Sequence, residues 1–255
     1  MPTLNKVAAI TLWFWVLKIL ATTLGETSGD LLALTLHLGY VTSLALTLST
    51  CLILLAGQLS AHRFHPFLYW AVIVGTTTAG TEISDMMDRS LQLGYPMGAA
   101  MLATGLIATL AIWRLTEGEL QVFPIFRRRP ELFYWIAILF SNSLGTAFGD
   151  FLSDSLGLGY ISGALLTSAI IVGVLGLHYA TRIDDNALFW IAFVFTRPFG
   201  ATFGDFLTKP VAAGGLAFDT YLASAIAAAL LIAIIIGTGG REARRAQAAR
   251  HPETS

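Results

Sequence analysis

Residues 134–160 read YWIAILFSNSLGTAFGDFLSDSLGLGY, and the same 27-residue pattern begins, without a gap, at three further positions, Phe14, Tyr69 and Phe189. An aromatic residue followed by tryptophan opens every copy. The aligned glycines are Gly25, Gly80, Gly145 and Gly200, and the aligned aspartates, five positions later, are Asp30, Asp85, Asp150 and Asp205. A fixed pattern of this kind indicates internal duplication of one structural unit.

The spacing between the copies divides the chain into two halves. Successive copies are offset by 55, 65 and 55 residues, so the two halves are offset by 120. Two membrane spans in each copy would leave all four copies in the same orientation. We therefore expect a pseudosymmetry axis along the membrane normal, unlike that of inverted-repeat transporters.

The composition predicts a polytopic membrane protein. Of the 255 residues, 55% are hydrophobic and 12% are charged, and the mean hydropathy is +0.71. Soluble chains carry about 25% charged residues. A net charge of −1 argues against a nucleic-acid partner, and the single cysteine, Cys51, excludes an intramolecular disulfide, a zinc finger and an iron–sulfur centre.

Apolar segments predict an all-α, polytopic helical bundle of about eight transmembrane helices, two from each repeat. The candidate spans are 8–24, 41–59, 67–81, 96–113, 132–148, 161–180, 187–204 and 216–237. The expected organisation is a single membrane domain, 1–240, with repeats at about 8–60, 66–114, 131–181 and 186–238, and a polar cytoplasmic tail, 241–255. Eleven of the 15 Lys and Arg residues then lie on the side of the two termini, which the positive-inside rule makes cytoplasmic.

The tandem G-x-x-x-G-D pattern resembles a bacterial family of multi-pass membrane proteins defined by a fourfold repeat of unknown function. The resemblance covers nearly the whole chain. The third and fourth copies match best, whereas the second has Ser84 in place of the second glycine. The resemblance implies a helical repeat architecture in a bacterial inner membrane, and it implies no particular activity.

The glycines predict either a broken helix or very close helix packing. As one helix, 27 residues would be about 40 Å long, against a hydrocarbon core of about 30 Å. A break would place polarised helix ends where ions bind. Alternatively, the motif serves packing, and the aspartate caps a second half-helix. The residues expected to break the backbone are Gly25, Gly29, Gly80, Gly145, Gly149, Gly200 and Gly204.

Acidic residues in the motif segments outnumber basic ones by eight to four, a formal charge of −4. The acids are Glu26, Asp30, Glu82, Asp85, Asp88, Asp150, Asp154 and Asp205. The basic residues are Lys18, Arg89, Arg197 and Lys209. A charge at the bilayer centre costs about 2.5 to 3.5 kcal/mol, so protons or bound cations are needed to balance the excess.

Carboxylates spaced by three or four residues share a helical face, where two of them can chelate one ion. Oxygen ligands suit Mn²⁺, Mg²⁺ or Ca²⁺. The predicted cation-binding residues are Glu26, Asp30, Glu82, Asp85, Asp150, Asp154 and Asp205, with Asp30, Asp85, Asp150 and Asp205 as metal ligands. Arg197 and Lys209 are expected to supply internal countercharge, Lys209 beside Asp205 and Arg197 toward another copy, or else to form plain salt bridges. No resident cofactor is expected.

Two further features have an ordinary explanation in a membrane protein. The aromatic-Trp pairs are expected to anchor the helices at the interface. Lys18 is expected to extend its ammonium group to the cytoplasmic interface.

The preferred function is a cation transporter or channel, most simply for a divalent ion such as Mn²⁺. Proton exchange fits, because carboxylates that bind a metal release protons. The chain is not expected to be an enzyme: an intramembrane aspartyl hydrolase would need partner motifs that the sequence lacks. A structural or accessory membrane protein is the main alternative. The sequence leaves open whether one chain or a homo-oligomer forms the pathway.

Overall fold

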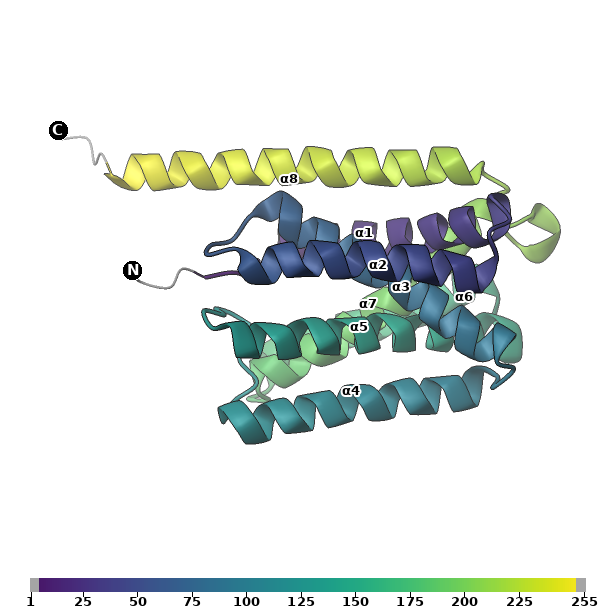
Figure 1. Cartoon of the computed structure of the whole chain (residues 1–255), viewed down its shortest axis with the longest axis horizontal. Helices are drawn as coiled ribbons and strands as arrows, with labels where there is room; N and C mark the ends of the chain where they lie inside the picture. Colours follow the sequence, from purple (N-terminus) through teal and green to yellow (C-terminus); the bar gives the residue numbers. More distant parts are fainter. Residues whose placement is uncertain (1–4, 251–255) are drawn as a thin grey trace.

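The computed structural model describes residues 5–250, with side chains described except at Asp154 and 240–250. This part of the chain contains α, π and 3₁₀ helices and no strands, as the all-α prediction requires. The α-helices are α1 (Leu12–Asp30), α2 (Gly39–Ser60), α3 (Pro66–Asp85), α4 (Tyr95–Glu117), α5 (Arg128–Asp150), α6 (Gly159–Ala180), α7 (Asp185–Thr208) and α8 (Thr220–Arg250). Their axes lie roughly along one line, and successive α-helices run in opposite directions (Figure 1).

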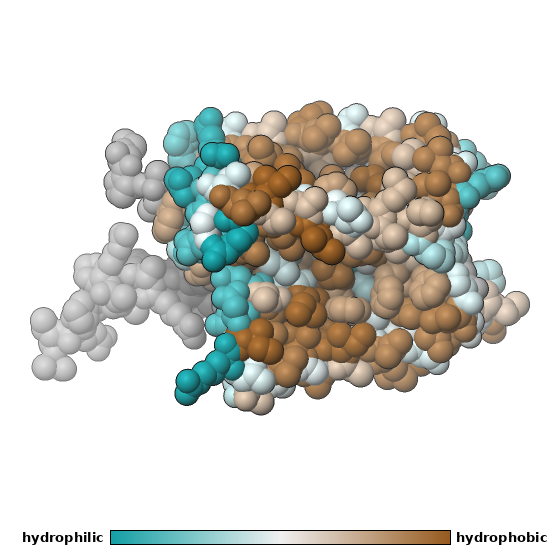
Figure 2. Space-filling view, turned by 90° about the horizontal axis from the view of Figure 1, so that it is seen from below, coloured by the Kyte–Doolittle hydropathy of each residue, from teal (hydrophilic) through white to brown (hydrophobic). Residues whose placement is uncertain are grey.

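Six helices within the described residues are long and apolar enough to cross a membrane: α2, α4, α5, α6, α7 and α8. The other two, α1 and α3, carry more polar side chains, among them Lys18, Glu26 and Glu82, and these are buried inside the protein. Figure 2 shows a broad apolar band on one face, with hydrophilic residues gathered toward the two ends. Such a surface is typical of a protein surrounded by lipid.

The first helices of the four copies form a ring. Helix α1 packs against α3 and α7, and α5 packs against the same two helices. The second helix of each copy covers the first helix of the next copy, α2 on α3, α4 on α5, α6 on α7 and α8 on α1. The four copies therefore follow one another in a closed cycle, with their inner helices parallel around one axis.

The aligned glycines are the points of closest approach in this ring. A Cβ atom on Gly25 would collide with Thr77, and one on Gly200 would collide with Thr22. The same contact recurs where Gly80 meets Asn142 and Gly145 meets Arg197. Each contact joins the glycine of one copy to the residue three positions before the aligned glycine of the next copy, so the missing side chain lets adjacent backbones approach.

The predicted backbone break at these glycines is wrong. Helix α1 continues through Gly25 and Gly29, α3 through Gly80, α5 through Gly145 and Gly149, and α7 through Gly200 and Gly204. Nor do the aspartates at the ends of α1, α3 and α5 act as caps, because their side chains make no capping hydrogen bond. Of the two expectations for the motif, close packing is the one that the structure supports.

The helix changes its winding directly after the aspartates of the first three copies. The π-helical turns η1 (Leu31–Thr35), η2 (Met86–Ser90) and η3 (Phe151–Ser155) follow α1, α3 and α5. In the fourth copy α7 ends at Thr208, and the 3₁₀ turn η4 (Val211–Ala213) follows Pro210. Proline lacks the N–H that a continued helix requires.

A further aligned glycine turns the chain toward each outer helix. Gly39, Gly94, Gly159 and Gly214 stand at the same position of the four copies and have φ between 69° and 87°. This left-handed region favours glycine. The fourth copy thus keeps the turn glycine although it lacks the closing tyrosine.

The aromatic-Trp pairs do not form the expected interfacial belt. Seven of these eight residues are buried, and only Trp15 is partly exposed. The first aromatic residue of each copy packs on the tryptophan of a neighbouring copy. The ring centroids are 5.6 Å apart for Phe14 and Trp70, 5.3 Å for Tyr69 and Trp135, 6.2 Å for Tyr134 and Trp190, and 5.7 Å for Phe189 and Trp15. Hydropathy alone does not distinguish such an interior layer from an interfacial belt.

Candidate functional site

The four aligned aspartates lie together near one end of the inner ring. Asp30, Asp85 and Asp150 are the last residues of α1, α3 and α5, and Asp205 lies in the last turn of α7. All four are buried. At 1.5 Å per residue, Asp30 lies about 27 Å along the helix from Leu12. The acid layer is therefore near the end of the bundle opposite the aromatic layer, and not halfway along it.

Arg89 joins the aspartates of the second and third copies. Its Nε lies 3.0 Å from Asp85 Oδ1, and its Nη2 lies 3.3 Å from Asp150 Oδ2. One guanidinium thus bridges α3 and α5. The sequence did not single out Arg89 as a countercharge, although it stands 120 residues before Lys209, the same offset that relates the two halves.

Lys209 makes the equivalent bridge between the fourth and first copies. Its Nζ donates a hydrogen bond of 2.6 Å to Asp30 Oδ2 and lies 3.4 Å from Asp205 Oδ1. The ion pair with Asp205 is the predicted one. The pair with Asp30 closes the ring between α7 and α1.

Arg197 reaches a carboxylate of another copy, as the sequence suggested. Its side chain is fully buried, and its Nη2 lies 2.8 Å from Glu26 Oε2. The same guanidinium donates to Thr81 Oγ1 and to the backbone oxygen of Thr22 at 3.3 Å. Arg197 therefore connects α7 with α1 and α3. Its partners Glu26 and Thr81 each lie one helical turn before the aspartate of their own copy.

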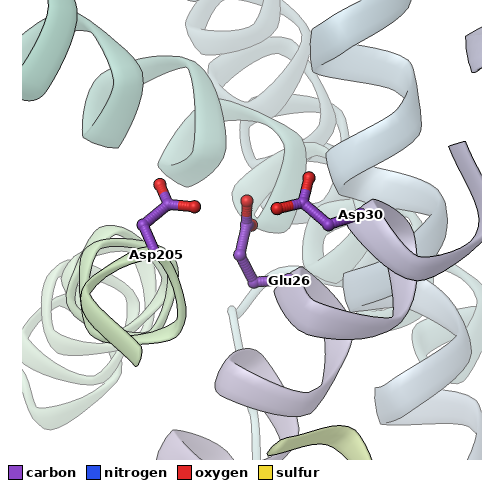
Figure 3. Close-up of side chains that lie close together, drawn as sticks. All are labelled: Glu26, Asp30 and Asp205. Carbon is purple, nitrogen blue, oxygen red and sulfur yellow. The ribbon is translucent and has the colours of Figure 1, made fainter. Parts of the chain in front are cut away.

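Glu26, Asp30 and Asp205 form the candidate metal centre. One carboxylate oxygen from each lies within 4.8 Å of those of the other two, and all three residues are buried. Figure 3 shows the three carboxylates pointing toward one another, two from α1 and one from α7. This spacing allows three oxygen atoms to contact one ion after small side-chain movements, and oxygen donors suit Mg²⁺, Ca²⁺ or Mn²⁺.

Other predicted ligands lie outside this cluster. Asp85 and Asp150 converge on each other through Arg89, so the four aspartates meet as two pairs and not as one four-ligand site. Glu82 is fully buried, and neither of its carboxylate oxygens has a hydrogen-bond partner among the described residues. The side chain of Asp154 lies outside the described residues.

The described acids of this layer exceed their cationic partners. The seven carboxylates are Glu26, Asp30, Glu82, Asp85, Asp88, Asp150 and Asp205, and the three bridging cations are Arg89, Arg197 and Lys209. The formal excess is four negative charges. Charges removed from water require compensation, so protons or bound cations are needed to balance this layer.

Lys18 does not reach the interface, contrary to expectation. Its side chain is completely buried, and Nζ donates a 2.7 Å hydrogen bond to Asn142 Oδ1. The ammonium also lies 3.9 Å from the centroid of the Phe193 ring. Lys18 is therefore an interior cation, held by an amide and an aromatic face between the acid layer and the aromatic layer.

A second buried ion pair, not predicted from the sequence, lies at the opposite end of the protein. The N-terminal segment places Lys6 Nζ on Glu131 Oε2 and 3.0 Å from the Leu59 oxygen. Gln58 Nε2 donates to Glu131 Oε1 at 3.0 Å. A cavity of about 340 Å³ also lies at this end, lined mainly by apolar residues of α1, α8 and the N-terminal segment. It contains no carboxylate and is not the cation site.

The fold and the site define a helical repeat protein with helices able to cross a membrane and a buried layer of acidic residues. The chain belongs to the family described as Repeat of Unknown Function (DUF347), whose model matches residues 13–64, 68–119, 133–184 and 188–238. Searches of the curated proteins and of the solved structures found no match.

Proposed function

We propose that this protein is a membrane transporter or channel for a divalent cation such as Mn²⁺, with Glu26, Asp30 and Asp205 as its central ligands. The observation that carries the proposal is the approach of three buried carboxylate oxygens to within 4.8 Å of one another. Burying several carboxylates together is unfavourable unless a cation or proton compensates them. A hard, oxygen-preferring ion is the ligand that this donor set favours.

The rest of the acid layer would tune this site. Thr81 lies 3.4 Å from Glu26 Oε2 and supplies a neutral oxygen nearby. Arg197 contacts the same carboxylate oxygen and also donates to Thr81, so it fixes the position of Glu26. Asp85 and Asp150 would contribute to the negative potential that attracts a cation, while Arg89 keeps them bound to each other.

The proposed topology has eight membrane spans in the bacterial inner membrane, with both termini in the cytoplasm. The inner helices would then begin at the cytoplasmic side, and the aspartates would lie toward the opposite side. This orientation is supported by the excess of Lys and Arg in the connectors at the end where α1 begins. Helices α1 and α3 are shielded from lipid by their neighbours, which is why their polar residues are compatible with a span.

A layer of buried aromatic residues along the inner ring forms a barrier that transport would have to open. Between the acid layer and the cytoplasmic end lie buried aromatic residues, including Tyr69 and Tyr134, whose hydroxyl groups are 2.6 Å apart. In the proposed transport cycle, this structure would be the state that is closed at the level of the aromatic residues. We propose that movement of adjacent repeats separates these aromatic residues, while the acidic site remains between α7 and α1.

A structural or accessory role is the second candidate. It is favoured by Arg89 and Lys209, since each joins two neighbouring inner helices and could serve only to hold the ring together. In that case removal of the carboxylates would affect assembly and stability without affecting any ion movement.

Flux through proteoliposomes distinguishes the two candidates. Purified protein would be reconstituted around a trapped Mn²⁺ indicator, with and without an imposed pH gradient, beside vesicles that contain Asp205→Asn protein. Mn²⁺ entry into wild-type vesicles that is lost in the variant supports transport. Equal entry in wild-type and protein-free vesicles, with normal folding of the reconstituted protein, rejects the transport proposal.

A further inference from the structure

The two ion-paired junctions of the ring have the same pattern of partners and different chemistry. Arg89 and Lys209 occupy equivalent positions, and each bridges the aspartate of its own copy to one of another copy. At the Lys209 junction Glu26, one helical turn before Asp30 in α1, adds a third carboxylate. The equivalent residue below Asp150 is Thr146. Only one of the two junctions therefore has three converging carboxylates among the described residues.

Lys209 lies where a bound cation would be expected. Its ammonium group contacts Asp30 and Asp205, two of the three carboxylates of the candidate metal centre. An ammonium group is a compact point charge, whereas a guanidinium binds two carboxylates through a planar, forked set of donors. Lysine is thus the better stand-in for a small metal ion, and arginine the better permanent link.

A neighbouring carboxylate indicates that Lys209 does not complete the site. Glu82 is entirely buried, and both of its oxygens lack a hydrogen-bond partner among the described residues. Its Oε1 lies 3.4 Å from the position that a Cβ of Gly29 would occupy, directly beside Asp30 on α1. An unpartnered acid facing this part of α1 is an independent sign of missing positive charge.

Lys209 also has room to leave. It follows the end of α7, and its side chain is 26% exposed, in contrast to the fully buried Arg197. The chain after it forms the short turn η4 and contains no further α-helix until Thr220. Rotation of the lysine stem toward solvent would free Asp30 and Asp205 without breaking a helix.

We propose that Lys209 is a tethered cation that occupies the acidic site in the absence of substrate and is displaced when a divalent metal ion binds. This inference rests on the proposed cation-transport function and adds that metal binding is coupled to movement of Lys209. The negative charge of the site would be compensated by the ammonium group in the metal-free state and by the ion in the metal-bound state. Arg89 would have no such exchange and would hold α3 and α5 together throughout.

Chemical labelling of the wild-type protein tests displacement directly. The acylation rate of the Lys209 amine by a water-soluble reagent would be followed by peptide mass spectrometry, with and without saturating Mn²⁺. The proposal predicts faster acylation with Mn²⁺. Unchanged or slower acylation, under conditions where calorimetry detects bound Mn²⁺, overturns the tethered-cation role and leaves the cation site standing.

Affinity measurements on variants provide the second test. Lys209→Gln should bind Mn²⁺ about tenfold more tightly than the wild type, equivalent to about 1.4 kcal/mol of relieved competition. Lys209→Arg should bind more weakly, because a forked donor holds both aspartates. Weaker or equal binding by folded Lys209→Gln protein contradicts the inference. No Mn²⁺ binding by either the wild type or Lys209→Gln contradicts the cation site itself.

Discussion

Arg89 and Lys209, 120 residues apart, make the same bridge at the two junctions that the offset relates. Each pairs with the aspartate four residues before it and with the aspartate of another copy. This relationship reveals a twofold pattern within the fourfold ring. The second and fourth copies each supply the bridging cation and one aspartate, whereas the first and third copies each supply only an aspartate. The twofold pattern is broken by Glu26 and Arg197, which are present at one junction only.

Arg197→Gln should destabilise the protein, because it leaves Glu26 buried without its cationic partner. Removing one member of a buried ion pair typically costs about 3–5 kcal/mol. Thermal and chemical unfolding in detergent would measure the loss. The double variant Arg197→Gln, Glu26→Gln should recover much of it, and a double variant less stable than the sum of the two single changes would contradict this pairing.

Gly200→Ala should disturb the contact between α7 and α1. The added methyl group would overlap the side chain of Thr22, and overpacking of this kind costs about 1–3 kcal/mol. The matched control is Gly173→Ala, because nothing lies within 4 Å of that position in α6. We expect a lower unfolding midpoint for Gly200→Ala and no decrease for Gly173→Ala. Equal midpoints would mean that close packing at Gly200 does not matter.

Gly94→Ala should strain the turn that leads into α4. Gly94 has φ 73° and ψ 153°, a backbone region almost confined to glycine, and occupying it with another residue costs about 1–3 kcal/mol. No atom lies within 4 Å of the added methyl group, so backbone strain alone would cause the loss. Gly176→Ala, within α6 and equally free of neighbours, is the control, and unchanged stability of both variants in detergent would refute the strain argument.

The architecture followed from the sequence because the repeat fixes both the number of units and the common orientation of their first helices. Helical content and the likeness of the four copies were therefore predictable. The neighbours of each copy were not, since periodicity describes one helix and gives no information about which outer helix covers which inner one. The cyclic order became visible only through contacts such as Gly200 with Thr22.

The sequence predicted which residues form the candidate site, but it predicted their arrangement only in part. The aspartate column and the roles of Arg197 and Lys209 as countercharges came from the pattern, and the structure brings these groups into contact. The burial of Lys18 was missed because a long side chain near a helix start can extend either to the interface or inward. The role of Arg89 could have been found by comparing the two halves at the 120-residue offset.

Mn²⁺ binding by calorimetry is the measurement that tests the central claim most directly. It would compare the wild type with two matched double variants. The first carries Asp30→Asn together with Asp205→Asn, and the second carries Asp85→Asn together with Asp150→Asn. The account predicts saturable binding that weakens by about a hundredfold in the first variant, since two of three ligands are lost, and by less than about tenfold in the second. Equal binding by the wild type and the first variant, or equal loss in two folded variants, would contradict a cation site between α7 and α1.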